Sequence, residues 1–317
     1  MLLEVRNLKK YFSTPGGDLH AVDGVSFGIE EGHTLGVVGE SGCGKSTLGR
    51  VILHLLDQTD GQIFFEGRDI THVNKRELKE LQKKMQIIFQ DPFSSLNPRM
   101  TVAQTIREPL LITKMYPKDQ IDKEVLRMMD TVGLARRLAN SYPHELDGGR
   151  RQRIGVARAL VLNPKFIVCD EPVSALDVSI QAQIINLLLD LQKERGLTYI
   201  FITHDLSVVK YLSHDILVMY LGQMVEKSPA RDIFRHPLHP YTKALLSAVP
   251  IPDVDVKLNR ILLKGELTSP INPKPGCRFA QRCIYAKDKC SQVNPELEEI
   301  LPGHTVACHY AREINGL

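Results

Sequence analysis

The sequence predicts an α/β fold with a mixed β-sheet, and two observations lead to this prediction. From residue 150 onward, helical and strand-like segments alternate in the order Arg151–Leu162, Phe166–Cys169, Ser179–Glu194 and Tyr199–Ile202. Such alternation is typical of a parallel sheet flanked by helices. Near the N-terminus, short strand-like stretches surround a Gly-Gly turn at residues 16–17, which predicts an antiparallel part beside the parallel one.

The first 60 residues are expected to form strands, a loop and one helix. Two stretches of mixed apolar and polar residues, Leu2–Val5 and Ala21–Phe27, predict strands, and the apolar run Leu35–Val38 predicts a buried strand. A glycine-rich loop follows this run directly. Beyond the loop, a helix is indicated by apolar residues at helical spacing, namely Leu48, Val51, Ile52, Leu55 and Leu56.

The middle of the chain predicts helices at Lys75–Lys84 and Gln120–Val132 around a short strand at Gln86–Phe89. Near residue 228 the composition changes, because prolines become frequent and long periodic segments disappear. We therefore expect a separate, loop-rich C-terminal region.

Composition excludes several classes of protein. The chain has 317 residues, of which 43% are hydrophobic and 24% charged, and its net charge is only +3, so we expect no nucleic-acid partner. No apolar run reaches the roughly 18 residues that a membrane span needs. Glu4 and Arg6 interrupt the apolar start, so it does not resemble a signal peptide. We expect a cytoplasmic protein, whose six cysteines do not form a disulfide framework.

The stretch from Gly39 to Thr47 fits the phosphate-loop pattern G-x-x-x-x-G-K-[ST] in full, between a predicted strand and a predicted helix. Its glycines allow backbone N–H groups to point at phosphates, and the helix N-terminus favours the same anion. Lys45 would contact the β- and γ-phosphates, and the Ser46 hydroxyl would ligate Mg²⁺. The sequence thus predicts a P-loop NTPase core that binds ATP and Mg²⁺, with a nucleotide site formed by Gly39, Ser41, Gly42, Cys43, Gly44, Lys45, Ser46 and Thr47.

Polar residues at the ends of later strands complete the predicted site. Asp170 and Glu171 end an apolar strand, where Asp170 would hold the hydration shell of Mg²⁺ and Glu171 would polarise the attacking water. His204 ends the next strand and can contact the γ-phosphate, although a lone histidine is more often structural. Gln90 ends a shorter strand, and its amide can reach Mg²⁺ or the water. Tyr11 can stack on a base, although a packed core tyrosine is commoner.

Together these residues resemble the nucleotide-binding subunits of ABC transporters, over residues 1 to about 250. The family signature, usually L-S-G-G-Q followed by R-Q-R, is matched by Leu146, Asp147, Gly148, Gly149 and Arg150. Pro172–Asp177 resembles the family's D-loop. The resemblance implies a helical signature subdomain at about 92–160 and a head-to-tail dimer, in which each ATP lies between one P-loop and the other subunit's signature. Asp177 and the signature residues then join the ATP site, and the region after Gln90 passes movement to membrane subunits.

The signature departs from the family pattern at two positions. Asp147 replaces a serine that would donate to the γ-phosphate, and Arg150 replaces a glutamine. Because a carboxylate repels the phosphate, one hypothesis is an asymmetric heterodimer with a second ATPase subunit. The alternative is that Asp147 turns away and acts as an ordinary helix N-cap.

Three further segments resemble the oligopeptide/dipeptide branch of ABC importers: Gln90–Arg99, His236–Pro252 and Gly276–Cys283. This resemblance implies import of di- or oligopeptides, or of nickel or another small solute, and a C-terminal extension at 251–317. It also implies two transmembrane permease subunits, an extracytoplasmic solute-binding protein, and a peripheral position on the cytoplasmic face of the cell membrane.

The cysteines of the tail are spaced C-x5-C-x6-C-x17-C. Four thiolates can hold a [4Fe–4S] cluster or Zn²⁺. The usual close-spaced zinc knuckles are missing, and some members of the branch carry an iron–sulfur cluster, so we favour the cluster. The alternative is four small buried residues. The residues concerned are Cys277, Cys283, Cys290 and Cys308.

Two other classes of function compete with a transporter ATPase. A soluble ABC ATPase without transport usually carries two cassettes or a long coiled-coil insertion, and this chain shows neither. A regulatory module that binds ATP without hydrolysis would not need both Glu171 and His204. We therefore expect an active ATPase.

Overall fold

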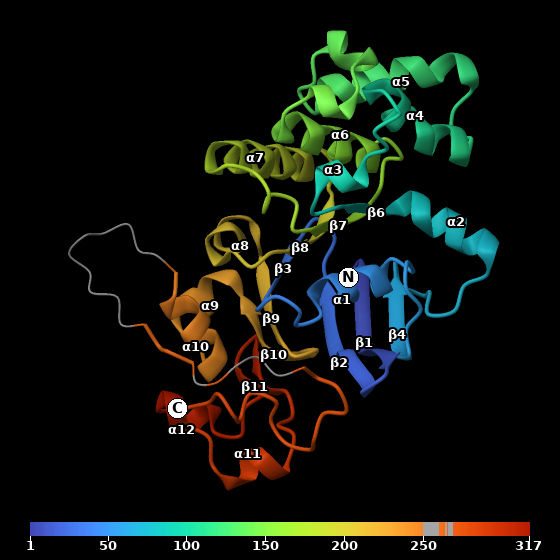
Figure 1. The fold of residues 1–317 in the computed structure, drawn as a ribbon. Helices are drawn as coiled ribbons and strands as arrows, with labels where there is room; N and C mark the ends of the chain where they lie inside the picture. Colours follow the sequence, from blue (N-terminus) through green and yellow to red (C-terminus); the bar gives the residue numbers. More distant parts are fainter. Residues whose placement is uncertain (250–259, 264, 266–268) are drawn as a thin grey trace. The chain divides into compact units, whose positions relative to one another are not determined.

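The computed structural model describes residues 1–249, 260–263, 265 and 269–317 (Figure 1). The described chain falls into two compact units. The first comprises Met1–Ile29, Thr34–Thr71 and Thr203–Leu317, and the second comprises Glu30–His33 and His72–Ile202. The expected domain boundary between residues 250 and 251 lies outside the described residues and stays a prediction, as does the part of His236–Pro252 beyond residue 249.

An antiparallel sheet opens the first unit, with the strand order β2-β1-β4-β5 (Figure 1). The hairpin of β1 and β2 is longer than predicted, because it pairs from Leu3 with Ile29 to Thr14 with Gly17. Its outer half is rich in polar residues, which hid its strand character from hydrophobic patterning. The strands are β1 (Leu3–Thr14), β2 (Gly17–Ile29), β4 (Asp60–Phe65) and β5 (Arg68–Asp69).

A second run of strands in the first unit has the order β11-β12-β10-β9-β3. β3 (Thr34–Val38) is parallel to β9 (Asp215–Tyr220), whereas the other neighbours are antiparallel. β10 (Gln223–Pro229) pairs with β12 (His304–Val306), which in turn pairs with β11 (Glu298–Leu301). The described part of the proline-rich tail thus belongs to this unit and extends its sheet through β12 and β11.

Short helices complete the first unit. α1 follows the phosphate loop, and the others lie after residue 203. They are α1 (Lys45–Ile52), α8 (Leu206–Leu212), α9 (Ala230–Arg235), α10 (Pro240–Ser247), α11 (Asp288–Gln292) and α12 (Ala311–Asn315).

The second unit contains three parallel strands in the order β8-β7-β6, which confirms the predicted parallel sheet. They are β6 (Met85–Ile88), β7 (Phe166–Asp170) and β8 (Thr198–Ile202). Every residue of β7 and β8 is buried, as expected for central parallel strands. Its helices are α2 (Lys75–Lys84), α3 (Pro92–Ser95), α4 (Val102–Thr113), α5 (Lys118–Thr131), α6 (Gly148–Leu160) and α7 (Val178–Arg195), with 3₁₀ turns at Arg136–Asn140 and Pro143–Glu145.

Side-chain caps explain where several helices begin. α2 has the predicted bounds because Asn74 and Glu77 form a reciprocal capping box at its first turn. α6 begins three residues earlier than predicted, since Asp147 caps it before Gly148. Within the described ranges, every helix is too short or too polar to cross a lipid bilayer.

Candidate nucleotide site

The loop between β3 and α1 has the backbone that its glycines predict. Gly39, Gly42 and Gly44 all have positive φ, at 151°, 77° and 105°. A Cβ atom on Gly44 would lie 2.0 Å from the carbonyl oxygen of Ala21, so only glycine fits there. The loop therefore curls tightly before α1 begins at Lys45.

Lys45 is directed back into this loop. Its side chain is 5% exposed, and Nζ donates to the carbonyl oxygens of Gly39 at 2.8 Å and Glu40 at 3.0 Å. Ser46 and Thr47 follow in the first turn of α1. A buried ammonium beside a curled loop and a helix N-terminus suits a phosphate chain. Cys43 is buried in the same loop, and burial raises the pKa of its thiol.

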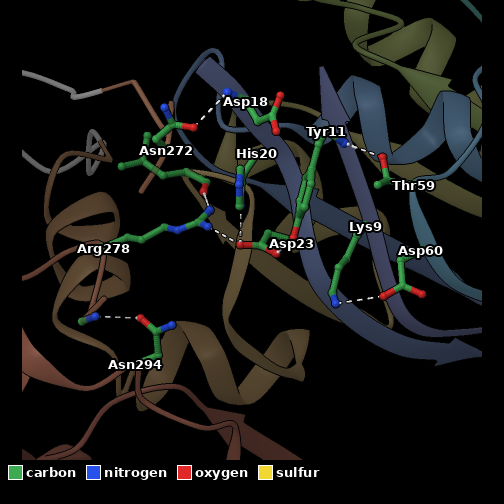
Figure 2. A network of polar contacts seen from close by, with 12 residues as sticks. Lys9, Tyr11, Asp18, His20, Asp23, Thr59, Asp60, Asn272, Arg278 and Asn294 are labelled. Atoms are coloured by element: carbon green, nitrogen blue, oxygen red, sulfur yellow. Dashed lines mark hydrogen bonds and ion pairs between the residues drawn. The ribbon is translucent and has the colours of Figure 1, made fainter. Parts of the chain in front are cut away.

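Tyr11 lies on β1 in a polar cluster that the sequence did not reveal (Figure 2). Its ring stacks on His20 with the centroids 3.8 Å apart, and its hydroxyl donates to Asp23. Burial, then the Asp23 contact, raises the pKa of Tyr11. Burial also raises the pKa of Asp23, but the hydrogen bonds from Tyr11 and His20 outweigh it and leave the pKa below its ordinary value. One face of the Tyr11 ring is thus occupied by His20.

His204 is exposed, follows the last residue of β8 by two positions, and belongs to the first unit. Its neighbours are fixed, because Thr203 donates its N–H to Val37 and Asp205 caps α8 through the N–H of Ser207. The histidine is therefore presented at a defined position beside β3.

In the second unit, Gln90 and Glu171 are brought together. Nε2 of Gln90 donates to Oε2 of Glu171 at 3.0 Å. Glu171 has a φ of 46°, in the left-handed region that few non-glycine residues adopt, and its N–H donates to the carbonyl oxygen of Ile202. Asp170 precedes it at the end of β7 and is 2% exposed. An amide that holds a carboxylate at the end of a buried strand can orient it toward a ligand.

The signature residues form the start of α6. Asp147 is the N-cap, since its Oδ1 accepts the N–H of Arg150 at 2.8 Å. The guanidinium of Arg150 also lies 3.3 Å from Oδ2 of Asp147. This geometry agrees with the N-cap alternative: in this chain the carboxylate is occupied by its own helix and by the arginine that replaces the family's glutamine.

The two signature glycines allow α6 to lie close to the segment after β7. A Cβ atom on Gly148 would lie 3.0 Å from Leu176, and one on Gly149 would lie 2.7 Å from Ile180. Asp177 lies between Leu176 and Ile180 in the sequence, and it caps α7 by accepting the N–H of Ile180 at 3.0 Å. Leu146 is buried just before the cap.

The four tail cysteines line one cavity of about 20 Å³, together with His239 and Tyr310. Burial raises the pKa of Cys277 to about 12, and it also raises the pKa values of Cys283 and Cys308. Among the described residues, no three His, Cys, Asp or Glu side chains are spaced to hold a metal ion. The four thiols therefore line one cavity, but as placed they do not form a group that could hold a metal ion.

Comparison with known protein families gives two matches. Residues 22–174 match the family described as "ABC transporter", and residues 225–290 match "Oligopeptide/dipeptide transporter, C-terminal region". The second match begins within β10 and includes three of the tail cysteines.

Comparison with curated proteins gives relatives along the whole chain. The chain is 53% identical to the putative oligopeptide transport ATP-binding protein YkfD of Bacillus subtilis, over 98% of this chain and 96% of that protein. It is also 53% identical to the oligopeptide transport ATP-binding protein OppF of Salmonella typhimurium, over 96% of this chain and 92% of that protein.

A solved structure confirms the fold of the core. The ATP-binding cassette MJ0796, in a dimeric post-hydrolysis state bound to ADP and Pi, has a TM-score of 0.66 and 28% sequence identity. The alignment covers 73% of this chain and 99% of that chain. Because the phosphate loop, the signature helix and the C-terminal region all agree with these matches, the chain belongs to the ATP-binding proteins of ABC transporters, in the oligopeptide/dipeptide branch.

Proposed function

We propose that this chain hydrolyses ATP to drive import of di- or oligopeptides. The observation that carries the proposal is the phosphate loop, in which the buried Lys45 ammonium lies inside a curl of positive-φ glycines. The oligopeptide/dipeptide C-terminal region and relatives named for oligopeptide transport support peptides as the cargo class.

In the first unit, Lys45 would bind the β- and γ-phosphates and the loop N–H groups would surround them. The Ser46 hydroxyl would hold Mg²⁺, which supplies charge neutralisation at the phosphates. Tyr11 would present one face of its ring to the base, and the hydrogen bond from its hydroxyl to Asp23 would fix the orientation of the ring. His204 would contact the γ-phosphate.

In the second unit, Glu171 would act as the general base that takes the proton of the attacking water. Gln90 holds this carboxylate through the 3.0 Å hydrogen bond and would orient it. Asp170 would hold the hydration shell of Mg²⁺. The family resemblance adds the signature of a facing subunit, which would close over the γ-phosphate, while this chain's own signature and Asp177 would face the nucleotide of that subunit.

The partners follow from the type of importer. A second ATPase subunit would face this chain head to tail, and two permease subunits and a solute-binding protein would complete the transporter at the cytoplasmic face of the membrane. Large exposed apolar side chains after Gln90 support a docking surface for the permease, because such residues are commonly covered by partners. They are Phe93, Leu111, Ile112 and Met115.

Asp147 would make the facing site the weaker one of an asymmetric pair. An ionised carboxylate can only accept hydrogen bonds, so it offers the phosphate no donor, and it already accepts the Arg150 N–H. The Arg150 guanidinium, 3.3 Å away, would offset part of its charge. A second ATPase with a standard signature would then complete the site built on Lys45.

The tail cysteines would hold a structural or redox-sensing [4Fe–4S] cluster, with Zn²⁺ as the alternative. Support comes from the convergence of all four on one cavity. Elemental analysis of anaerobically purified protein should find about four iron atoms per chain. Stoichiometric zinc would favour the alternative, and absence of both metals would remove the proposal.

Two variants of the assembled transporter test the ATPase assignment. Glu171→Gln should keep ATP binding but lose at least about 100-fold in turnover, since the proton acceptor is gone while the phosphate loop is intact. Lys45→Ala should lose binding as well. Unchanged hydrolysis in Glu171→Gln would contradict the assigned role of this residue, and unchanged hydrolysis in both variants would contradict the site.

A further inference from the structure

Two arginines of the C-terminal tail reach the loops of the candidate nucleotide site. Arg278 directly follows Cys277, and Arg282 directly precedes Cys283. Both residues are partly buried, with side chains that are 7% and 11% exposed. All residues concerned lie in the first unit. The cysteine-bearing turn is therefore connected to the nucleotide loops through charged side chains rather than through apolar packing alone.

Arg282 binds Glu40, which directly follows Gly39 of the phosphate loop. Its Nη1 and Nη2 donate to the two carboxylate oxygens at 2.7 and 3.1 Å, a bidentate arrangement. Glu40 is also held by its backbone, because its N–H donates to Tyr241 at 2.9 Å and its carbonyl oxygen accepts from Lys45. Three contacts thus fix Glu40, whose carbonyl oxygen helps to orient the Lys45 ammonium.

The negative charge of Glu40 makes its ion pair with Arg282 relevant to the binding of a triphosphate. An unpaired carboxylate at this point would repel a triphosphate bound at Lys45 and could draw the ammonium away from it. Arg282 neutralises the carboxylate and directs it toward the tail. A partly buried pair of this kind is screened by salt much less than a surface pair.

Arg278 acts on the other side of the site, where Figure 2 shows it pointing into the Tyr11 cluster. Its Nη2 donates to Asp23, the residue that also accepts from Tyr11 and His20. Its Nη1 donates to the carbonyl oxygen of Leu221. The single guanidinium therefore fixes the carboxylate that holds the Tyr11 ring in place.

The same arginine is connected to the phosphate loop through the turn that follows β9. Gly222, next to Leu221, donates its N–H to the carbonyl oxygen of Cys43 at 2.9 Å. The carbonyl oxygen of Gly222 accepts the N–H of Asp23 at 2.8 Å. A Cβ atom on Gly222 would lie 2.4 Å from the carbonyl oxygen of His20. Only glycine therefore allows the turn to approach β2 this closely.

We propose that Arg278 and Arg282 are positioning residues for ATP, Arg282 on the phosphate side and Arg278 on the base side. The C-terminal lobe thereby forms one wall of the nucleotide site rather than a separate appendage. The inference rests on the proposed ATP site at Lys45 and Tyr11, and it adds two residues from outside the cassette motifs.

The phosphate side is tested with Arg282→Ala, measured as mant-ATP affinity of the full-length chain and as KM and kcat of the assembled transporter. We expect Kd and KM to rise about tenfold with kcat within about twofold, because Glu171 is untouched. The double variant Glu40→Ala/Arg282→Ala should recover most of the affinity, since the unpaired carboxylate is removed as well. Arg312→Ala, an exposed arginine of the same lobe, is the control and should change neither constant.

The base side is tested with Arg278→Ala and Arg278→Lys. Arg278→Ala should raise the Kd for ATP about tenfold. Inhibition by inorganic tripolyphosphate should stay unchanged, because tripolyphosphate has no base that could stack on Tyr11. Arg282→Ala should weaken the binding of both ATP and tripolyphosphate. Arg278→Lys keeps one donor for Asp23 and should restore part of the ATP affinity.

The outcomes separate this inference from the proposed function. If Lys45→Ala abolishes mant-ATP binding but both arginine variants bind as wild type with unchanged melting temperature, the ATP site stands and the positioning role is wrong. Equal losses of ATP and tripolyphosphate in Arg278→Ala would overturn the assignment of that residue to the base side. If the double variant does not recover ATP affinity, Arg282 does not act through Glu40.

Discussion

Glu226 on β10 lies fully buried against His304 on β12, with Oε1 of the carboxylate 2.7 Å from Nε2 of the imidazole. The same carboxylate accepts the N–H groups of Leu238 at 2.7 Å and His239 at 3.1 Å. One side chain therefore joins the last strand of the cassette to the tail strand and to the start of α10. This contact explains how a proline-rich tail becomes part of the first unit.

Glu226→Ala should destabilise the first unit by about 3 kcal/mol, because it leaves two buried N–H groups and a buried imidazole without their acceptor. The midpoint of urea unfolding, followed by circular dichroism, measures the change. Glu298→Ala on the exposed strand β11 is the control and should shift the free energy of unfolding by less than about 0.5 kcal/mol. Equal midpoints for the two variants would contradict the role of Glu226.

His239 predicts how the stability of the tail depends on pH. Burial lowers the pKa of His239 to about 4, so the folded chain keeps this imidazole neutral. The unfolded chain binds a proton near pH 6.5, and stability is therefore intact above pH 6.5 and falls as the pH is lowered toward 4. A difference of this size corresponds to about 3 kcal/mol.

His239→Asn should reduce this loss at low pH. Asparagine can accept the N–H of Tyr241 as the N-cap of α10, as the imidazole does, but it does not titrate. Melting temperatures measured from pH 7.5 to 4.5 should fall less steeply for the variant than for the wild type. Parallel curves would mean that other groups dominate the acid response.

Local signals predicted much of this fold. The capping box of Asn74 and Glu77 fixes the start of α2, and the continuous apolar run of β7 identifies a buried strand without any knowledge of its neighbours. The phosphate loop was recognisable because its chemistry is local, with glycines, lysine and hydroxyls in one short stretch. In each of these cases the physical cause lies within a few residues of its effect.

The missed features depend on pairing between distant segments. β11 begins with Glu298 and Glu299, which no hydrophobic pattern marks as a strand, and it forms because β12 offers it an edge. Arg278 contacts Asp23 across 255 positions of sequence, and Arg282 contacts Glu40 across 242. Nothing near either arginine in the sequence points to these acceptors, so the lobe's contribution to the nucleotide site emerged only from the structure.

Gly44 and Gly42 give a matched pair of substitutions in the phosphate loop. Both have positive φ, but a Cβ on Gly44 meets the Ala21 carbonyl oxygen at 2.0 Å, whereas one on Gly42 meets nothing within 4 Å. Gly42→Ala should cost only the backbone strain, about 1 kcal/mol, and keep measurable mant-ATP binding. Gly44→Ala must displace β2 or the loop and should lose binding altogether. Similar affinities in the two variants would contradict the close approach of Gly44 to β2.

Asp147 allows its two roles, as helix cap and as a charge in the signature, to be separated by substitution. As the N-cap of α6 it accepts the Arg150 N–H at 2.8 Å, so Asp147→Ala should cost about 1 kcal/mol of stability. Asp147→Ser keeps a capping oxygen and should be nearly neutral for stability, while it removes the carboxylate and restores the family's hydroxyl. Thermal melts of the full-length chain distinguish the two variants.

The same pair of variants tests the asymmetry of the proposed dimer. In the assembled transporter, Asp147→Ser should raise the turnover of the site that faces this signature, because a hydroxyl donates to the phosphate where the carboxylate repels it. Single-turnover measurements, with the site built on Lys45 disabled by Glu171→Gln, isolate that facing site. A serine variant with wild-type turnover and wild-type stability would leave Asp147 as a helix cap alone, and the asymmetry would then have to arise in the partner subunit.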